Sequence, residues 1–399
     1  MTVEQGTVVV RPASGGAELG FVCVDSTVNG RARGGLRLMP DVTPHELELL
    51  ARAMTLKYGF LGLPHGGAKA GVKGDPEAPA EERAAVLRRF AERVAPLFRS
   101  RAYVPDSDMG TAGSDIQRML ESVGIRVARR EYRGNHSGLY TAATVFEAAR
   151  AAAAARELPL AGCRVAIEGY GRVGQPLAEM FVRAGAIVVA ISTRRGGLHN
   201  PLGLDVAAVG ERIRAGGEAT VADSGLGGRI AASDLKFVPA DILCPCARHD
   251  SITLDDAGAV GATVISCGAN SPVTPAAERR LWERGILCVP DFVANSGGVL
   301  GGTMEFAGWR PGEIVEFCDR RFRPRVASMI REAVEAGRPL REVAEAFALR
   351  RFAGVKRLAE QDSWRRGGLD AALAAYREGW VPGRLVRWLS AGYFGRRVG

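Results

Sequence analysis

The chain has 399 residues, of which 47% are hydrophobic and 24% are charged, and this balance excludes a disordered or collagen-like protein. Its net charge of +9 raises the question of nucleic-acid binding. From residue 310 onward, however, 19 Arg and Lys residues are interleaved with 11 Asp and Glu residues, as on solvated amphipathic helices. We therefore expect no nucleic-acid partner.

The sequence also gives no sign of a membrane or metal partner. No apolar run approaches the roughly 18 residues that span a bilayer, and the N-terminal residues do not resemble a secretory signal. Seven cysteines without a pairing pattern favour free thiols in a reducing compartment. Cys244 and Cys246 lack the second pair of ligands that a zinc site needs. We expect a cytoplasmic protein that holds no metal.

The first segment predicts short strands near residues 7–11 and 20–25, followed by a helix. Thr43 is a suitable N-cap, the next residue is a proline, and Glu46 stands at the capping-box position. The apolar periodicity carries this helix to about residue 60.

Two loops that carry polar side chains follow in the chain. Residues 63–71 are so rich in glycine that we expect a tight loop presenting Lys69. A long amphipathic helix and a short strand then lead into a second loop, 105–111, which carries the carboxylates of Asp106 and Asp108.

From about residue 141 a helix is followed by alternating strands and helices. Continuous apolar strands in such an alternation predict a doubly wound parallel sheet with helices on both faces, so the fold class is α/β. The expected strands are 164–169, 186–192, 241–246, 263–268 and 287–291.

Lysine is scarce, since only five of the 53 cationic residues are lysines, yet three of them lie between residues 57 and 73. Arg keeps its proton in a protein, whereas a buried Lys near another cation can become a base. We therefore place chemistry on Lys57, Lys69 and Asp108, with Arg33 close by. Taken alone, Lys69 could equally be a surface lysine and Asp108 a turn carboxylate.

Residues 169–174, GYGRVG, follow an apolar strand and open a helix, which is the context that a dinucleotide-binding turn requires. The glycines would let the backbone approach a pyrophosphate at the helix N-terminus. A glycine-rich turn used only for packing is the alternative. The candidate cofactor contacts are Gly169, Gly171, Arg172, Val173 and Gly174.

The end of the following strand bears on the choice of cofactor. An NAD-preferring site usually has an acid there to accept from the ribose 2′-OH. This chain has Thr193 followed by Arg194 and Arg195, which could pair with a 2′-phosphate. NADP is therefore favoured over NAD, although both arginines could simply be solvated.

Several motifs occur in order between about residue 20 and residue 305. They are GGLR at 34–37, MTLK at 54–57, PHGGAKAG at 64–71, PDSDMGT at 105–111, GYGRVG at 169–174, GANSP at 268–272 and PDFVANSGG at 290–298. Together these motifs resemble the glutamate/leucine/phenylalanine/valine dehydrogenase family. The resemblance implies NAD(P)-dependent oxidative deamination of an L-amino acid, a small molecule, to a 2-oxo acid and ammonium, and the reverse reductive amination.

The resemblance also implies roles for individual residues. Lys57 would hold the substrate α-carboxylate, Lys69 would be the catalytic lysine and Asp108 would shuttle protons. Gly34 and Gly35 belong to the substrate-binding motif.

In the second part of the chain the resemblance implies that Thr141, Asn270 and Asn295 face the dinucleotide. Asn295 would fix the nicotinamide carboxamide. Each of the three could instead be a helix cap or a turn residue.

The resemblance completes the expected organisation. We expect a homo-oligomer whose subunit has a substrate-binding and oligomerisation domain at 1–137, a Rossmann-type dinucleotide-binding domain at 138–305 and a helical C-terminal segment at 306–399. We expect this last segment to pack back on the first domain.

Two departures from the family pattern bear on the substrate. Arg33 stands where glutamate-specific members carry a lysine for the side-chain carboxylate, and a cation here favours glutamate slightly. Gly302 stands where those members offer a serine hydroxyl, so the pocket would be larger and could admit a branched-chain or aromatic side chain. A non-catalytic regulatory relative is a further alternative, which the presence of both lysines and Asp108 disfavours.

Overall fold

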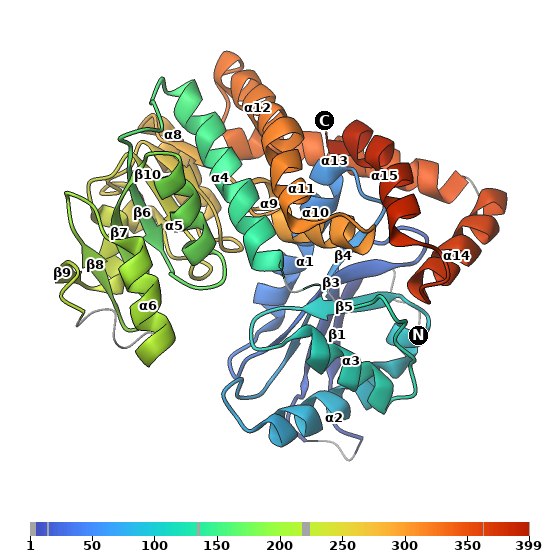
Figure 1. The fold of residues 1–399 in the computed structure, drawn as a ribbon. Coiled ribbons are helices and arrows are strands. Elements are labelled where there is room, and N and C mark those ends of the chain that lie inside the picture. The colour runs from blue at the N-terminus through green and yellow to red at the C-terminus, as the bar shows by residue number, and fades with distance from the viewer. Residues whose placement is uncertain are drawn as a thin grey trace. The chain divides into compact units, whose positions relative to one another are not determined.

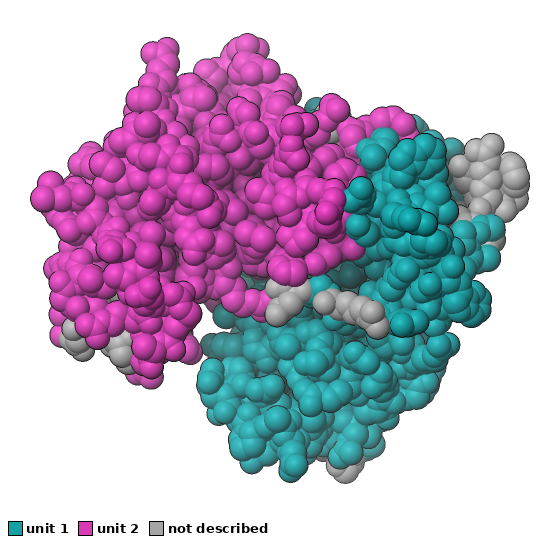
Figure 2. Space-filling model, viewed as in Figure 1, with its two compact units in different colours: residues 1–135, 306–308, 347–393 teal, residues 136–305, 309–346, 394–399 magenta. Residues whose placement is uncertain are grey.

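The computed structural model describes residues 5–13, 16–132, 134, 136–217, 224–361 and 363–398. The chain forms two compact units, which Figure 2 colours separately. The first unit comprises residues 1–135, 306–308 and 347–393, and the second comprises residues 136–305, 309–346 and 394–399.

The first unit is built on a five-stranded mixed sheet with the strand order β1-β2-β4-β3-β5 (Figure 1). Strand β3 is parallel to both of its neighbours, β4 and β5, whereas β2 is antiparallel to β1 and β4. The strands are β1 (Gly6–Val10), β2 (Gly20–Val24), β3 (Ala32–Leu38), β4 (Gly66–Val72) and β5 (Tyr103–Ser107).

Helices cover the two faces of this sheet. On one face, Leu47 and Leu50 of α1 (Pro44–Leu61) pack against Phe21 and Cys23 of β2. On the other face, α2 (Ala80–Arg99) and α3 (Gly113–Ser122) pack against residues that alternate with these along the strands. Helix α1 begins as predicted, because the side chain of its N-cap, Thr43, accepts the N–H of the residue three positions on.

The prediction of a loop at 63–71 is wrong, because β4 occupies most of this segment and Lys69 lies in the middle of the strand. The glycines serve close packing. A Cβ at Gly66 would lie 2.1 Å from the carbonyl oxygen of Ser26, and one at Gly67 would lie 2.3 Å from the backbone nitrogen of Thr55. The predicted loop at 105–111 also begins later than expected, since β5 extends to Ser107.

The second unit contains a seven-stranded sheet with the order β12-β11-β10-β6-β7-β8-β9. The strands from β12 to β7 are parallel, which confirms the predicted doubly wound sheet, and β8 and β9 extend it as antiparallel strands. The strands are β6 (Arg164–Glu168), β7 (Ile187–Thr193), β8 (Gly196–His199), β9 (Gly228–Ile230), β10 (Ile242–Pro245), β11 (Val264–Ser266) and β12 (Leu287–Val289).

Helices make up most of the rest of the chain, and the predicted helical C-terminal segment is confirmed (Figure 1). No helix within the described residues is both long and apolar enough to traverse a membrane. The helices after α3 are α4 (Ser137–Ala155), α5 (Gly174–Arg183), α6 (Val206–Gly216), a 3₁₀ helix at Ala232–Phe237, α7 (Leu254–Ala257), α8 (Pro275–Glu283), α9 (Asp291–Ala294), α10 (Gly297–Phe306), α11 (Pro311–Phe317), a π turn at Cys318–Phe322, α12 (Arg323–Glu335), α13 (Leu340–Gln361), α14 (Ser363–Arg377) and α15 (Gly383–Val398).

Candidate active site

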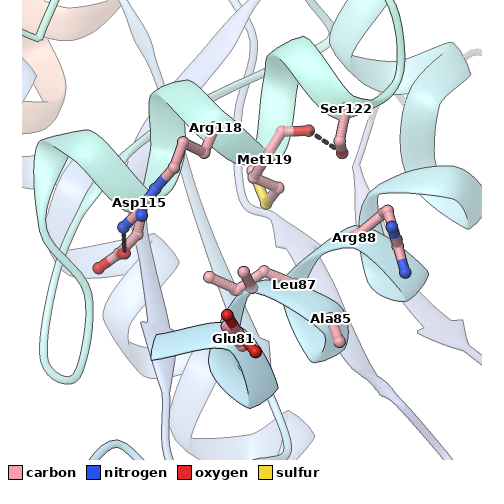
Figure 3. Close-up of a pocket in the computed structure, with 9 residues that line it drawn as sticks. Glu81, Ala85, Leu87, Arg88, Asp115, Arg118, Met119 and Ser122 are labelled. Carbon is pink, nitrogen blue, oxygen red and sulfur yellow. Dashed lines mark hydrogen bonds and ion pairs between the residues drawn. The ribbon is translucent and has the colours of Figure 1, made fainter. Parts of the chain in front are cut away.

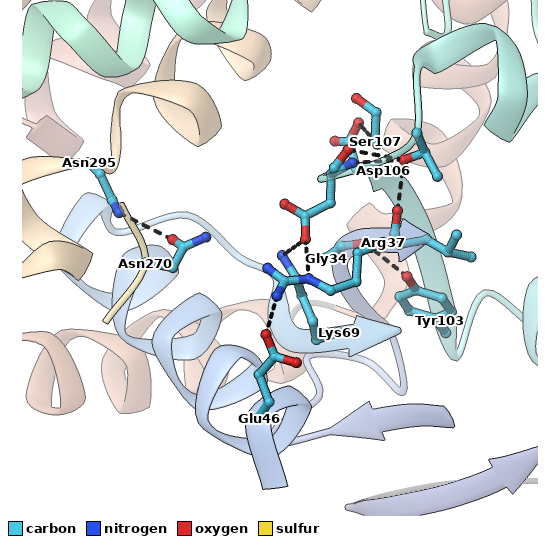
Figure 4. Close-up of polar contacts among 12 residues, drawn as sticks. Gly34, Arg37, Glu46, Lys69, Tyr103, Asp106, Ser107, Asn270 and Asn295 are labelled. Atoms are coloured by element: carbon cyan, nitrogen blue, oxygen red, sulfur yellow. Dashed lines mark hydrogen bonds and ion pairs between the residues drawn. The ribbon is translucent and has the colours of Figure 1, made fainter. Parts of the chain in front are cut away.

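A buried charge cluster lies on the face of the first sheet that carries α1 (Figure 4). The Lys69 Nζ atom lies 2.7 Å from Asp108 Oδ2, and Arg37 Nε donates to the same oxygen at 3.0 Å. Arg37 also donates to the carboxylate of Glu46 at the start of α1. The side chains of Lys69 and Arg37 are each only 5% exposed, so one carboxylate oxygen is shared by two desolvated cations.

Gly35 makes room for this contact. Strand β3 runs between β4, which carries Lys69, and β5, which Asp108 follows. A Cβ at Gly35 would lie 2.8 Å from Asp108 Cβ and 3.1 Å from Lys69 Nζ. Gly34 has a different role, because its missing Cβ would lie 1.6 Å from the backbone oxygen of Ala68, so glycine there lets β3 and β4 pair closely.

The backbone of Asp108 is fixed by Thr111. The Thr111 hydroxyl donates to the carbonyl oxygen of Leu36 at 2.8 Å and accepts the N–H of Asp108 at 3.0 Å. Thr111 therefore ties the backbone of Asp108 to β3, the same strand that carries Arg37. These two hydrogen bonds limit how far Asp108 can move from Lys69.

Burial and nearby charges shift the two titratable groups of the contact. Burial, assisted by the Arg37 cation, lowers the pKa of Lys69, although Asp108 opposes the shift. Burial alone would raise the pKa of Asp108, but Lys69 and Arg37 outweigh it and hold that pKa below its ordinary value. The cluster therefore favours a carboxylate next to an amine that gives up its proton more readily than a free lysine.

The other predicted substrate residues of this unit lie on neighbouring elements. Lys57 of α1 is buried, with 6% of its surface exposed. It follows Thr55 by two residues, and Thr55 lies against Gly67 of β4. Arg33 lies on β3 and its Nη2 contacts Asp106 Oδ2 at 2.9 Å.

Sequence reasoning assigned no role to Arg37 and Asp106, and it gave Glu46 only a role in capping. The strand period could have found the first of these, because Arg37 lies two residues after Gly35 and therefore on the same face of β3.

In the second unit the predicted glycine turn joins β6 to α5. Gly169 has φ +89, a conformation that favours glycine, and a Cβ there would lie 2.9 Å from the backbone of Ala247, which follows β10. A Cβ at Gly174 would lie 2.0 Å from the carbonyl oxygen of Gly169, so the backbone packs closely there. Gly171 has no heavy atom within 4 Å of its Cβ position, so the turn is open there, beside Arg172 and Val173 at the start of α5.

This turn lies at the switch point of the sheet. From β6 the chain continues to β7 on one side, and β10 later pairs with β6 on the other side. Open α/β sheets bind their ligands at the carboxyl ends of strands at such a point.

The loop after β11 and the turn between α9 and α10 bring the predicted asparagines together (Figure 4). Asn295 Nδ2 donates to the oxygen of Ala269 at 2.8 Å and to Asn270 Oδ1 at 3.2 Å. Asn295 Oδ1 is buried and has no hydrogen-bond partner among the described residues. Thr141 lies in the first turns of α4, and a Cβ at Gly298 would approach its Oγ1 to 3.0 Å.

Arg341 supports these loops, which sequence reasoning did not foresee. Its guanidinium donates to Asp291 Oδ1 at 3.0 Å and also binds Glu278. The other carboxylate oxygen of Asp291 accepts the N–H of Ser271 at 3.0 Å. The ion pair therefore connects α13 with the loop that carries Asn270 and with α9, whose C-cap is Asn295.

Thr193 ends β7 next to the glycine turn. The preceding residue, Ser192, accepts the N–H of Tyr170 on its carbonyl oxygen and the N–H of Gly169 on its hydroxyl oxygen. Thr193 Oγ1 accepts the N–H of Arg195, and Arg194 is exposed.

Gly302 is an exposed residue of α10, and apart from its chain neighbours and the backbone of its own helix no heavy atom lies within 4 Å of its Cβ position. A separate pocket between α2 and α3, drawn in Figure 3, contains none of the predicted site residues. Within the described part of the chain, no group of three or more His, Cys, Asp or Glu side chains could hold a metal ion.

Two family models match the chain. The model described as Glu/Leu/Phe/Val dehydrogenase, dimerisation domain, matches residues 5–124, and the one described as Glutamate/Leucine/Phenylalanine/Valine dehydrogenase matches residues 136–359. The chain belongs to this family. The family and the class of enzyme predicted from the motifs, an amino-acid dehydrogenase, are therefore confirmed.

Individual relatives agree with this result. The chain is 36% identical over 300 residues to an NADP(+)-dependent glutamate dehydrogenase of Pyrobaculum calidifontis and 33% identical over 292 residues to an NAD-specific glutamate dehydrogenase of Staphylococcus aureus. Both matches cover 70% of this chain and 69% of the relative. A hetero-hexameric glutamate dehydrogenase of Thermus thermophilus, in its Leu-bound form, has a similar structure, with a TM-score of 0.74, 28% identity and 90% of each chain covered.

Proposed function

We propose that the chain catalyses the NAD(P)-dependent oxidative deamination of an L-amino acid to a 2-oxo acid and ammonium, and the reverse reductive amination. The observation that carries the proposal is the buried contact between Lys69 and Asp108. Burial lowers the pKa of this amine, so it gives up its proton more readily than a free lysine and can take the proton back, next to a carboxylate. Membership of the dehydrogenase family supports the same reaction.

The residues of the second unit fit a nicotinamide dinucleotide. The turn is open at Gly171, where a backbone amide can approach a pyrophosphate, and α5 presents its N-terminal N–H groups there. The unpartnered Asn295 Oδ1 is suited to accept the N–H of a carboxamide such as that of nicotinamide, with Asn270 and Thr141 beside it. When bound, the dinucleotide supplies the acceptor for the hydride that leaves the substrate Cα.

In this proposal Lys57 binds the substrate α-carboxylate. Loss of one proton from nitrogen and of the hydride from Cα leaves an iminium. Lys69, as the free amine, takes a proton from water as the water oxygen bonds to Cα. The proton returns to nitrogen with the help of Asp108, the C–N bond breaks, and the nitrogen leaves as ammonium with the hydroxyl proton, which gives the 2-oxo acid.

Glutamate is the first substrate to test, because Arg33 provides a cation near the cluster and the two relatives named above are glutamate dehydrogenases. The open space at Gly302 favours the alternative, a branched-chain or aromatic amino acid. NADP is favoured over NAD because Thr193 offers no carboxylate and Arg194 follows it.

We also propose that the subunit works as a homo-oligomer in the cytoplasm. The first family model is described as a dimerisation domain, which supports an oligomer. The expected domain boundaries, 1–137, 138–305 and 306–399, remain part of the proposal.

The test is the absorbance of reduced nicotinamide in mixtures of the purified chain, NAD or NADP, and each of the twenty amino acids. We expect reduction with glutamate or with a branched-chain or aromatic amino acid. If none of the twenty amino acids reduces NAD or NADP, the result would contradict the proposal and favour a non-catalytic relative.

A further inference from the structure

A second ion pair lies on the same face as the Lys69–Asp108 contact. Arg33 Nη2 and Asp106 Oδ2 are 2.9 Å apart, and Asp106 Oδ1 accepts the N–H of Ser107 at 3.0 Å. The side chains of Arg33 and Asp106 are 41% and 44% exposed, so the pair is open to a molecule bound at this face.

The strand period places the two ion pairs on one face of the sheet. Side chains an even number of residues apart on a strand point to the same face, so Arg33 lies with Gly35 and Arg37 on β3. On the neighbouring strand, Asp106 of β5 precedes Asp108, which directly follows β5, by two residues. Two residues correspond to roughly 7 Å along a strand, and a substrate with its Cα at Lys69 can span such a separation toward Asp106 with a side chain of three or four bonds.

Two further cations, Arg377 and Arg31, lie close enough to act on His65, and Arg377 also interacts with Arg33. The rings of Tyr58 and His65 are 5.3 Å apart, and the Tyr132 hydroxyl donates to the carbonyl oxygen of Pro105 at 2.8 Å. Burial, assisted by nearby cations of which Arg33 acts most strongly, lowers the pKa of His65 to about 3, so this imidazole is neutral at pH 7.

We propose that Asp106 is a specificity-determining residue that disfavours acidic side chains. The inference rests on the proposed function, which places the substrate Cα at Lys69. A side-chain carboxylate that reaches Arg33 also meets the carboxylate of Asp106, and like charges at this range repel. An uncharged side chain meets no such repulsion. Asp106 therefore shifts the choice between glutamate and a neutral amino acid toward the neutral one.

The first experiment compares kcat/KM for glutamate with that for leucine in the native chain and in Asp106→Asn. Asparagine keeps the shape and the acceptor for the N–H of Ser107 but removes the charge. We expect the glutamate-to-leucine ratio to rise about tenfold, allowing for solvent screening at this half-exposed site. Glu378→Gln, which removes the carboxylate of an exposed ion pair with Arg126 in the same unit, is the matched control and should leave the ratio unchanged.

The second experiment measures binding without turnover. Glutarate and pentanoate have the same carbon chain but differ by one carboxylate, and calorimetry gives the dissociation constant of each for the full chain. Asp106→Asn should tighten glutarate about tenfold relative to pentanoate. In an Arg33→Ala background the same substitution should have a smaller effect, because the cation that draws the carboxylate to Asp106 is gone.

The outcomes separate this inference from the proposed function. If no variant oxidises any amino acid, the proposed function fails, and the ratio of glutarate to pentanoate binding still decides the role of Asp106. Ratios that change less than twofold in Asp106→Asn, or that change equally in Glu378→Gln, overturn the inference. Absence of binding of both acids to every variant overturns it as well.

Discussion

Lys69 and Asp108 meet across Gly35. The two side chains come from β4 and from the end of β5, with β3 between them, and their 2.7 Å contact passes over the one position of β3 that lacks a side chain on that face. Glycine at this position is therefore a requirement of the contact itself. Its φ lies outside the left-handed region, so the requirement is one of space.

We expect Gly35→Ala to separate the two groups. The new Cβ would lie 2.8 Å from Asp108 Cβ, and overpacking of this kind typically costs about 1–3 kcal/mol. Turnover should fall about a hundredfold or more if proton transfer is lost. The control is Gly354→Ala, in α13, where no heavy atom lies within 4 Å of the Cβ position. Native turnover in Gly35→Ala would show that the contact is not needed.

Lys69→Ala should lower the turnover rate by about a thousandfold or more and leave dinucleotide binding unchanged. Lys69→Arg is the informative companion, because it keeps a cation next to Asp108 but cannot give up its proton. We therefore expect both variants to be inactive. Steady-state rates and the dissociation constant of the reduced dinucleotide, measured by fluorescence, check this. An active Lys69→Arg would mean that Lys69 acts only through its charge.

The pH dependence of deamination should report the Lys69 amine. Only the neutral amine can accept a proton, so the rate should rise with pH through a pKa that lies below that of a free lysine. Arg37 contributes to this lowering, and Arg37→Gln should move the rising limb to higher pH. Arg37→Lys keeps the cation and should leave the limb near its native position. The measurement is the pH profile of kcat/KM, and an unmoved limb in Arg37→Gln would refute the assignment.

The sequence predicted the parts of the site that depend on local pattern. The strand, glycine turn and helix around Gly169 follow one another along the chain, so hydrophobic runs and spacing suffice to find them. The segment around Lys69 was mistaken for a loop, because composition does not distinguish a glycine needed for a turn from one needed for close packing. Positions 66 and 67 require glycine because the backbone of Ser26 packs against Gly66 and the backbone of Thr55 packs against Gly67.

The residues that sequence reasoning missed act through partners far away in the chain. Asp106 meets Arg33 across 73 residues, and Arg341 meets Asp291 across 50. No local period signals such pairs, which exist only once the strands and helices have been placed side by side. A role for Arg37 could have been predicted from the strand period, because Arg37 lies on the same face of β3 as Gly35.

Thr193→Asp should shift cofactor preference from NADP toward NAD. A carboxylate at the end of β7 can accept from a ribose 2′-OH and repels a 2′-phosphate, and it retains an acceptor for the N–H of Arg195. We expect the NADP-to-NAD ratio of kcat/KM to fall about tenfold or more. Arg194→Ala is the comparison, since it removes a cation and adds no acceptor for the hydroxyl. A ratio that stays constant in Thr193→Asp would exclude this position as the discriminating one.

Gly302→Ser should raise the use of glutamate relative to leucine. The hydroxyl can donate to a side-chain carboxylate, and the open space around the Cβ position admits it without displacing a neighbour. Replacing a glycine in a helix interior by any residue other than proline also stabilises the helix, by up to about 1 kcal/mol relative to glycine. Gly302→Ala therefore serves as the control, because it gains this stability and lacks the hydroxyl. We expect both variants to unfold at a higher temperature and only the serine variant to change the ratio of kcat/KM for glutamate to that for leucine. An equal change in both would mean that the size of the side chain, and not its hydroxyl, sets the preference.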